Sequence, residues 1–412
     1  MVKVLSYGRH RSVILEAPSH DKDCVLANIL AAHFLCSSDP SRAPSHLQAA
    51  KSRLEQATQY EKAVFDAVNC LISENRDDDV ALELHSKAGH YPPSLLLLKS
   101  FPKDLVSLKR AQVLCFYMAR PDLSLDLVQQ VLPNNEQENY IYGMLSFPLL
   151  ELGWMTEAEK AAKKGYEINK QDCWVHHNLC HVLQYDCRFK EAVEFMKECS
   201  SSWDSCSSFM VTHNWWHVAL CYLEGHSPIQ TVLNVYDHCI WKELEKPDAA
   251  SPEVYLNALG LLLRVHVRGE IDAFEDRLKT LANCVTDQAN WYLEWHLDVL
   301  ILWALANTGE ISKAEDLLKG LTSRIAKMKK KKQQLMQRPI QLGASSQYHC
   351  YQLAEALYEY GRAIEVIEKR IKTREGIPFL WRLLERGYKL TGREEAAIAS
   401  EKAKLLETAY FP

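Results

Sequence analysis

Histidine is the residue type whose spacing in this chain could support chemistry. His177 and His181 are four residues apart, and His213 and His217 repeat that spacing further along the chain. Residues four apart lie on one face of a helix, so each pair would place two imidazoles one turn apart. Two imidazoles in this arrangement can chelate a transition metal, because neutral histidine nitrogens are common metal ligands.

An enzyme that used these histidines would need a carboxylate or a metal ion beside them. The sequence has no His-Glu-x-x-His motif, and Gln184 stands where a carboxylate could serve as base or ligand. Glu294 and His296 lie further along and could face the same groove. We therefore expect no catalytic residue, no bound metal and no cofactor, and we keep a metal-dependent or hydrolase-like enzyme as the alternative.

Tryptophan and amide side chains accompany the histidines. These histidines could be core residues that hydrogen-bond to neighbouring helices, or they could form a polar pocket, because a ligand site combines a few polar groups with aromatic ones. On the second interpretation a peptide or protein partner contacts His177, His181, Gln184, His213, Asn214, Trp215, His217, Glu294 and His296.

The elements that position these residues are predicted to be paired helices. Apolar residues return every three or four positions along most of the chain, which indicates helices rather than strands. The turn at Gly153 to Ala158 is repeated 34 residues later at Cys187 to Ala192, and 34 residues is the tetratricopeptide period. Each helix pair must stack on its neighbours to bury its apolar face. The sequence therefore predicts an all-α, tetratricopeptide-type helical-repeat solenoid.

We expect one solenoid over residues 1–412, with its clearest repeats at 139–172, 173–206, 211–244 and 295–328. Residues 335–367 are expected to be irregular, with apolar surface left uncovered, because a turn there is too short for a complete repeat. In tetratricopeptide folds the first helix of each pair lines the concave groove, and this places His177 and His181 on the groove side.

Composition limits the partners and the compartment. The chain has 48 Lys and Arg against 53 Asp and Glu, so we expect no general attraction to nucleic acid or to anionic membranes. Its apolar stretches are much shorter than the ~18 to 20 residues that span a bilayer. Thirteen cysteines without a Cys-x-x-Cys pair, and no apolar run near Met1 for a secretion signal, indicate reduced thiols in the cytoplasm.

Two stretches carry a family resemblance: Trp174-Val175-His176-His177-Asn178-Leu179-Cys180-His181 and His213-Asn214-Trp215-Trp216-His217-Val218-Ala219-Leu220. They resemble the tetratricopeptide repeat protein 38 family, and the chain is similar to a shortened member. The resemblance implies a right-handed helical solenoid in the cytosol with no established enzymatic activity, and it supplies no ligand. The family's acidic residues at two positions are replaced here by Gln184 and Asn257.

The sequence thus favours a non-enzymatic interaction or scaffold protein over an enzyme. Repeat solenoids commonly hold an extended peptide or a partner helix in their concave groove. We expect a peptide or protein partner in that groove, and neither nucleic acid nor membrane.

Overall fold

The computed structural model describes residues 2–73, 76–85, 97–327, 360–372 and 375–407. Helices make up well over half of these residues, and none of them belongs to a strand, which confirms the all-α prediction. The chain forms two compact units, Met1–Val175 and His176–Pro412. Among the described helices, none has the length and apolar composition needed to cross a bilayer.

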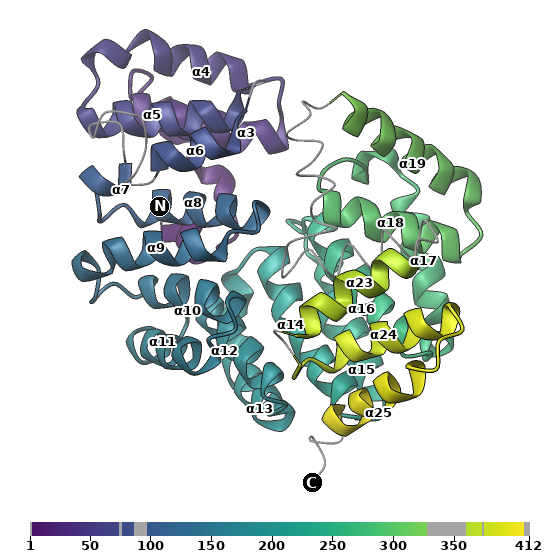
Figure 1. Cartoon of the computed structure of the whole chain (residues 1–412). Helices are drawn as coiled ribbons and strands as arrows, with labels where there is room; N and C mark the ends of the chain where they lie inside the picture. Colours follow the sequence, from purple (N-terminus) through teal and green to yellow (C-terminus); the bar gives the residue numbers. More distant parts are fainter. Residues whose placement is uncertain (1, 74–75, 86–96, 328–359, 373–374, 408–412) are drawn as a thin grey trace. The chain divides into compact units, whose positions relative to one another are not determined.

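The first unit is a succession of helices, most of which pack on a helix next to them in the sequence (Figure 1). Its longer helices form pairs such as α8 with α9 and α10 with α11, and this pairing gives the tetratricopeptide-type fold. The helices are α1 (Val2–Leu5), α2 (Ala17–His20), α3 (Val25–Ser38), α4 (Ala43–Ser52), α5 (Gln59–Ile72), α6 (Asp78–His85), α7 (Leu97–Ser100), α8 (Leu105–Tyr117), α9 (Pro121–Val131), α10 (Ile141–Glu151) and α11 (Met155–Ile168).

The second unit is likewise built from helices packed on one another. The helix α12 (Cys173–Tyr185) begins in the first unit, and most of it belongs to the second. In the second unit α13 packs on α14, α14 on α16, and α16 on α18. The remaining helices are α13 (Phe189–Cys199), α14 (Ser208–Glu224), α15 (Ile229–Val235), α16 (Ser251–Val267), α17 (Glu275–Val285), α18 (Trp295–Asn307), α19 (Ile311–Ala326), α23 (Tyr360–Ile371), α24 (Pro378–Leu390) and α25 (Ala396–Glu407).

One turn closes many of the first helices. The Trp154 N–H donates to the Leu149 carbonyl at 2.9 Å, and 34 residues later the Arg188 N–H donates to the Leu183 carbonyl at 2.8 Å. This bond requires the residue just before the donor to have a left-handed backbone conformation. Such a position favours glycine. Positive φ angles occur there in Ala119, Gly153, Cys187, His226, Gly269, Gly309 and Gly392.

Pro148 lies inside α10, where its ring removes one backbone hydrogen bond from the helix. The carbonyl left without that donor belongs to Met144, and the side-chain amide of Gln112 on α8 donates to it at 2.8 Å. A buried glutamine on the neighbouring helix therefore satisfies the acceptor that the proline leaves open.

Most of the segment that we expected to be irregular lies outside the described residues. Its described end belongs to α23, which begins at Tyr360 and buries Ile364 and Ile367. The four repeat ranges and the single solenoid remain predictions. Helix pairs α10–α11, α12–α13 and α18–α19 lie within three of the ranges, whereas α14 begins at Ser208, before the range 211–244.

Close helix packing at Gly165 gives a stability test. A Cβ added to Gly165 on α11 would lie 2.9 Å from Val175 Cγ2 and 3.0 Å from Tyr142 Cβ. We predict that Gly165→Leu lowers the free energy of unfolding by about 1 to 3 kcal/mol, because the larger side chain separates packed helices. Urea denaturation followed by circular dichroism measures this change. Lys164→Leu, at an exposed neighbouring position, is the control and should have little effect; equal loss in both variants would contradict the packing argument.

Candidate functional site: a histidine cluster

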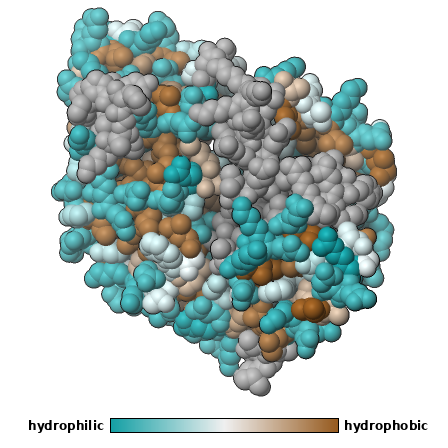
Figure 2. Space-filling view, viewed as in Figure 1, coloured by the Kyte–Doolittle hydropathy of each residue, from teal (hydrophilic) through white to brown (hydrophobic). Residues whose placement is uncertain are grey.

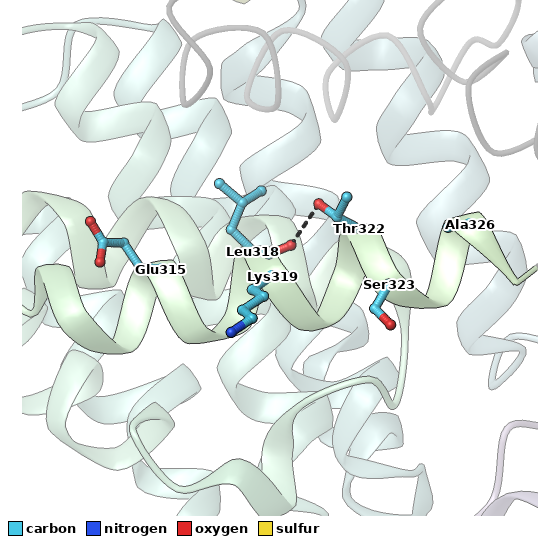
Figure 3. A pocket seen from close by; sticks show the side chains of 6 residues that line it. All are labelled: Glu315, Leu318, Lys319, Thr322, Ser323 and Ala326. Atoms are coloured by element: carbon cyan, nitrogen blue, oxygen red, sulfur yellow. Dashed lines mark hydrogen bonds between the residues drawn. The ribbon is translucent and has the colours of Figure 1, made fainter.

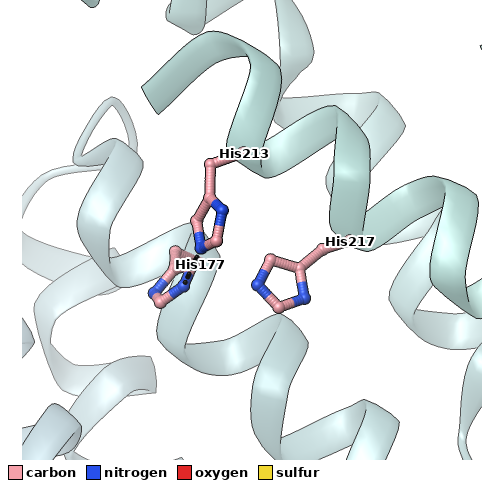
Figure 4. Close-up of side chains that lie close together, drawn as sticks. All are labelled: His177, His213 and His217. Atoms are coloured by element: carbon pink, nitrogen blue, oxygen red, sulfur yellow. Dashed lines mark hydrogen bonds between the residues drawn. The ribbon is translucent and has the colours of Figure 1, made fainter. Parts of the chain in front are cut away.

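Four imidazoles from two helices meet in the second unit. His177 and His181 come from α12, and His213 and His217 come from α14. The ring centroids of His177 and His181 are 4.5 Å apart, those of His181 and His217 4.3 Å, and His177 lies 4.9 Å from both His213 and His217. Figure 4 shows His213 and His217 pointing from one helix toward His177 on the other.

The cluster is largely closed to solvent. His177 and His217 are 2% and 1% exposed, whereas His181 and His213 are half-buried. Nε2 of His177 lies 3.1 Å from Nε2 of His181 and 3.1 Å from Nε2 of His213. Three ring nitrogens therefore share a small volume of the protein interior.

Side-chain amides hold the outer nitrogens of the rings. Nδ1 of His213 lies 2.8 Å from Oδ1 of Asn257 on α16, and Nδ1 of His217 lies 3.1 Å from Oε1 of Gln184 on α12. Nδ1 of His177 lies 3.1 Å from Oδ1 of the adjacent Asn178. Three of the four rings are thus oriented by an amide oxygen, which fixes ring direction without adding a charge.

Gln184 connects the cluster to a buried ion pair. Its Nε2 donates to Oε2 of Glu224 at 2.8 Å, and Arg264 Nη1 donates to the other carboxylate oxygen at 3.2 Å. Glu224 is 3% exposed, and burial raises the pKa of its carboxyl while Arg264 opposes that shift. The carboxylate that Gln184 connects to the cluster therefore has a cationic partner.

Burial keeps His213 and His217 neutral near pH 7. Desolvation lowers the pKa of His213 to about 4, partly offset by its hydrogen bond to Asn257. Desolvation also lowers the pKa of His217 well below its usual value, and the neighbouring imidazoles add to the shift. A neutral ring has one nitrogen with a proton and one with a free lone pair.

Aromatic rings fix His213 from both sides. Phe209 stacks on it at 4.9 Å between centroids and 16° between planes, and Trp216 stacks at 5.3 Å and 9°. Phe209, His213 and Trp216 lie on one face of α14 because they are four and then three residues apart. Sandwiched in this way, the ring of His213 has little freedom to rotate.

The other predicted site residues have contacts of their own. Trp215 packs on Trp203, with centroids 5.3 Å apart, and Asn214 is fully buried on α14. Glu294 and His296 pair with each other at 3.1 Å at the start of α18, a helix that packs on α16. His176 accepts a hydrogen bond from Trp203 at 3.1 Å, so for this residue the core interpretation applies.

The site residues predicted from the sequence do not include three parts of the cluster. Phe209 and Trp216 could have been found from the helical register of His213, because they share its face. Asn257 is 44 positions from His213 in the sequence, and its role depends on how α16 packs on α14. The sequence offered no local signal for that contact.

The first unit has its own polar group among aromatic rings. The ammonium of Lys109 lies 4.2 Å from the ring centre of Tyr7 and 4.3 Å from that of Trp174, and it donates to the Tyr7 hydroxyl. Desolvation lowers the pKa of Lys109 to about 7, against the attraction of Asp172. Burial likewise raises the pKa of Asp172 to about 7.

A shallow depression lies along one face of α19 (Figure 3). Among the described residues, its lining comes from this single helix: Glu315, Leu318, Lys319, Thr322, Ser323 and Ala326. These residues alone give a ligand few converging contacts, so we assign the depression no function.

Comparison with known proteins places the chain in no family, because no family model matches it. Among solved structures it is similar to the Rap protein complexed with competence and sporulation factor, at 11% identity, with 94% of this chain and 98% of that chain covered and a TM-score of 0.42. It is also similar to the human IFIT1 dimer with m7Gppp-AAAA, at 14% identity, with 98% and 94% covered and a TM-score of 0.38.

The low pKa of His213 predicts how stability depends on pH. Its pKa falls from 6.5 in the unfolded chain to about 4 in the folded one, so the unfolded state binds more protons between these values. Stability is therefore full above about pH 6.5 and falls as pH decreases toward 4, by about 1.4 kcal/mol per pH unit for this group.

We predict that His213→Gln reduces that slope, in urea denaturation with a chelator present at pH values from 7.5 to 4.5. The variant loses packing at residue 213, which lowers stability at every pH. It also loses a titrating group, and that loss changes only the slope of the free energy of unfolding against pH. His238→Gln, at an exposed position of the same unit, should keep the wild-type slope. Identical slopes in wild type and His213→Gln would show that this ring binds its proton over the same pH range in the folded and the unfolded chain, which would contradict the prediction.

Proposed function

We propose that this chain is a non-enzymatic interaction protein that holds an extended peptide segment of a partner protein. One observation carries the proposal: aromatic side chains form a row across three successive first helices of the first unit. Phe116 comes from α8, Phe147 from α10 and Trp174 from α12, with centroids 6.0 Å and 4.9 Å apart along the row. Phe116 also contacts Tyr117, at 5.6 Å.

The α8 end of this row reaches solvent. Tyr117 is 53% exposed, and Val113, one turn earlier on α8, is 44% exposed. Hydrophobic residues reach the surface of the first unit between hydrophilic ones (Figure 2). Exposed tyrosine beside an aliphatic residue is typical of an interface anchor, because the ring buries a large area at a low cost in conformational entropy.

The contacts of the histidines support binding over hydrolysis. Within the described residues, the ring nitrogens of His213 contact Asn257 and His177, and Nδ1 of His217 contacts Gln184. A hydrolytic base is normally oriented by a carboxylate that stabilises its protonated form. An amide orients a ring equally well but cannot stabilise the imidazolium by charge. The polar contacts that we propose for a partner are the half-buried residues His181, Gln184 and His213.

We also propose a cytoplasmic setting and membership of the tetratricopeptide repeat protein 38 family. Free thiols among the described cysteines support the first. The stretches that begin at Trp174 and His213 support the second. The two amides that replace family acids, Gln184 and Asn257, are those that hold His217 and His213.

A peptide-binding assay tests the proposed function. Peptides selected from a displayed random library on the purified full chain are labelled, and their affinity is measured by fluorescence anisotropy. We predict that Tyr117→Ala weakens binding at least tenfold, because an anchoring tyrosine contributes more than about 1.4 kcal/mol. Ile398→Ser, which changes a residue 60% exposed on α25, is the control and should bind as the wild type does.

Three results would contradict the proposal. The first is failure to select any peptide. The second is equal affinity of the wild type and Tyr117→Ala for every selected peptide. The third is saturable binding of an RNA oligonucleotide, used as the competitor, in place of peptide. Circular dichroism spectra of both variants establish that any lost binding is not lost folding.

A further inference from the structure

The histidine cluster has an arrangement of lone pairs that a peptide-binding role does not require. One nitrogen of each of His177, His213 and His217 lies within 4.8 Å of one nitrogen of both others. In Figure 4 the ring nitrogen of His217 that is farther from its Cβ faces His177. The positions of the protons on the imidazole rings decide whether these nitrogens repel one another or can bind a common ligand.

Hydrogen bonds fix the proton of His213. The side-chain nitrogen of Asn257 donates to Thr212 Oγ1 at 2.8 Å and to the carbonyl of Glu253 at 3.2 Å. These acceptors determine which end of the amide is nitrogen, so Oδ1 of Asn257 must face His213 and accept from Nδ1–H. Nε2 of the neutral His213 ring therefore has a free lone pair.

The same reasoning applies to His217. Nε2 of Gln184 donates to Glu224, which leaves Oε1 of Gln184 to accept from Nδ1–H of His217. Nε2 of His217 is buried and has no hydrogen-bond partner among the described residues. A buried nitrogen without a partner costs free energy that a ligand would recover.

His177 completes the set. Its Nδ1 lies 3.1 Å from Oδ1 of Asn178, and a proton on this Nδ1 leaves a lone pair on Nε2, which lies 3.1 Å from Nε2 of His213. Two lone pairs at this distance repel unless a proton or a cation lies between them. An imidazole that donates Nδ1–H to an amide or carboxylate and offers Nε2 to a cation is the arrangement typical of metal-bound histidines.

We propose that Nε2 of His177, His213 and His217 binds one divalent transition-metal ion such as Zn²⁺. The half-buried His181, whose Nε2 lies 3.1 Å from Nε2 of His177, is the candidate fourth ligand. With Zn–N distances of about 2.0 to 2.1 Å, tetrahedral geometry places ligand nitrogens roughly 3.3 Å apart. Small side-chain rotations bring the three nitrogens to that separation.

The donor set selects the class of metal. Imidazole nitrogens suit Zn²⁺, Co²⁺, Ni²⁺ and Cu²⁺, whereas Mg²⁺ and Ca²⁺ prefer oxygen ligands. Arg264, a cation that acts on His217, is paired with Glu224 at 3.2 Å and so adds no net charge beside the ion. Phe209 and Trp216 hold the His213 ring in place before binding, which lowers the entropic cost of forming the site.

Calorimetric titration with Zn²⁺ tests the proposal on the full chain, after treatment with a chelator and its removal by dialysis. We expect one ion per chain with a Kd of about 1 μM or below. His213→Gln should weaken binding at least tenfold, and Asn257→Leu, which removes the acceptor for Nδ1, should weaken it about 10- to 100-fold. His238→Gln is the matched control, at an exposed histidine of the same unit, and should bind as the wild type does.

Visible absorption of the Co²⁺-loaded wild type gives a second measurement that needs no variant. Tetrahedral nitrogen ligation produces strong visible bands without the thiolate-to-metal charge-transfer band that a cysteine site would show. The proposal is overturned if the wild type binds no Zn²⁺ at micromolar concentrations, if the charge-transfer band appears, or if a folded His213→Gln variant keeps wild-type affinity.

Discussion

Side-by-side packing of successive helices is the constraint on which the rest of the structure depends. A helix pair of this kind cannot bury its apolar faces alone, so each pair must lie against the next. In the first unit Gly165 has no side chain where α11 meets Tyr142 and Val175, which allows a close approach. In the second unit, the neighbouring helices α12 and α14 bring the rings of His177 and His213 together. The histidine cluster is thus a product of the repeat packing.

Much of this arrangement could be predicted from the sequence. The helical period, the turns at Gly153 and Cys187 and the four-residue spacing of the histidines all depend on contacts between residues close in sequence. Trp215 is among the residues that we expect to contact a partner, and its neighbour Trp216 stacks on His213. One residue along a helix turns a side chain by about 100°, so the two indoles face different neighbours.

The features that could not be predicted from the sequence depend on contacts between segments that are far apart in the chain. Asn257 and Glu224 acquire their roles through the packing of α14 and α16 and through the bond of Gln184 to Glu224. The repeat period gives the order of helices but not the rotation of each helix about its axis. That rotation decides whether an asparagine faces solvent or an imidazole. The pKa of His213 could not be anticipated for the same reason, because it depends on burial by other helices.

The turn that ends the first helices affects how substitutions can alter the stability of this chain. Ala119, Cys187 and His226 hold a left-handed backbone that glycine would adopt with less strain, and each non-glycine residue there costs on the order of 1 kcal/mol. The chain therefore contains a reserve of stability that single substitutions could release, one turn at a time. Because repeat stability is approximately additive, that reserve could compensate for destabilising changes elsewhere. Such compensation would let neighbouring repeats diverge in sequence while the packing between them persists.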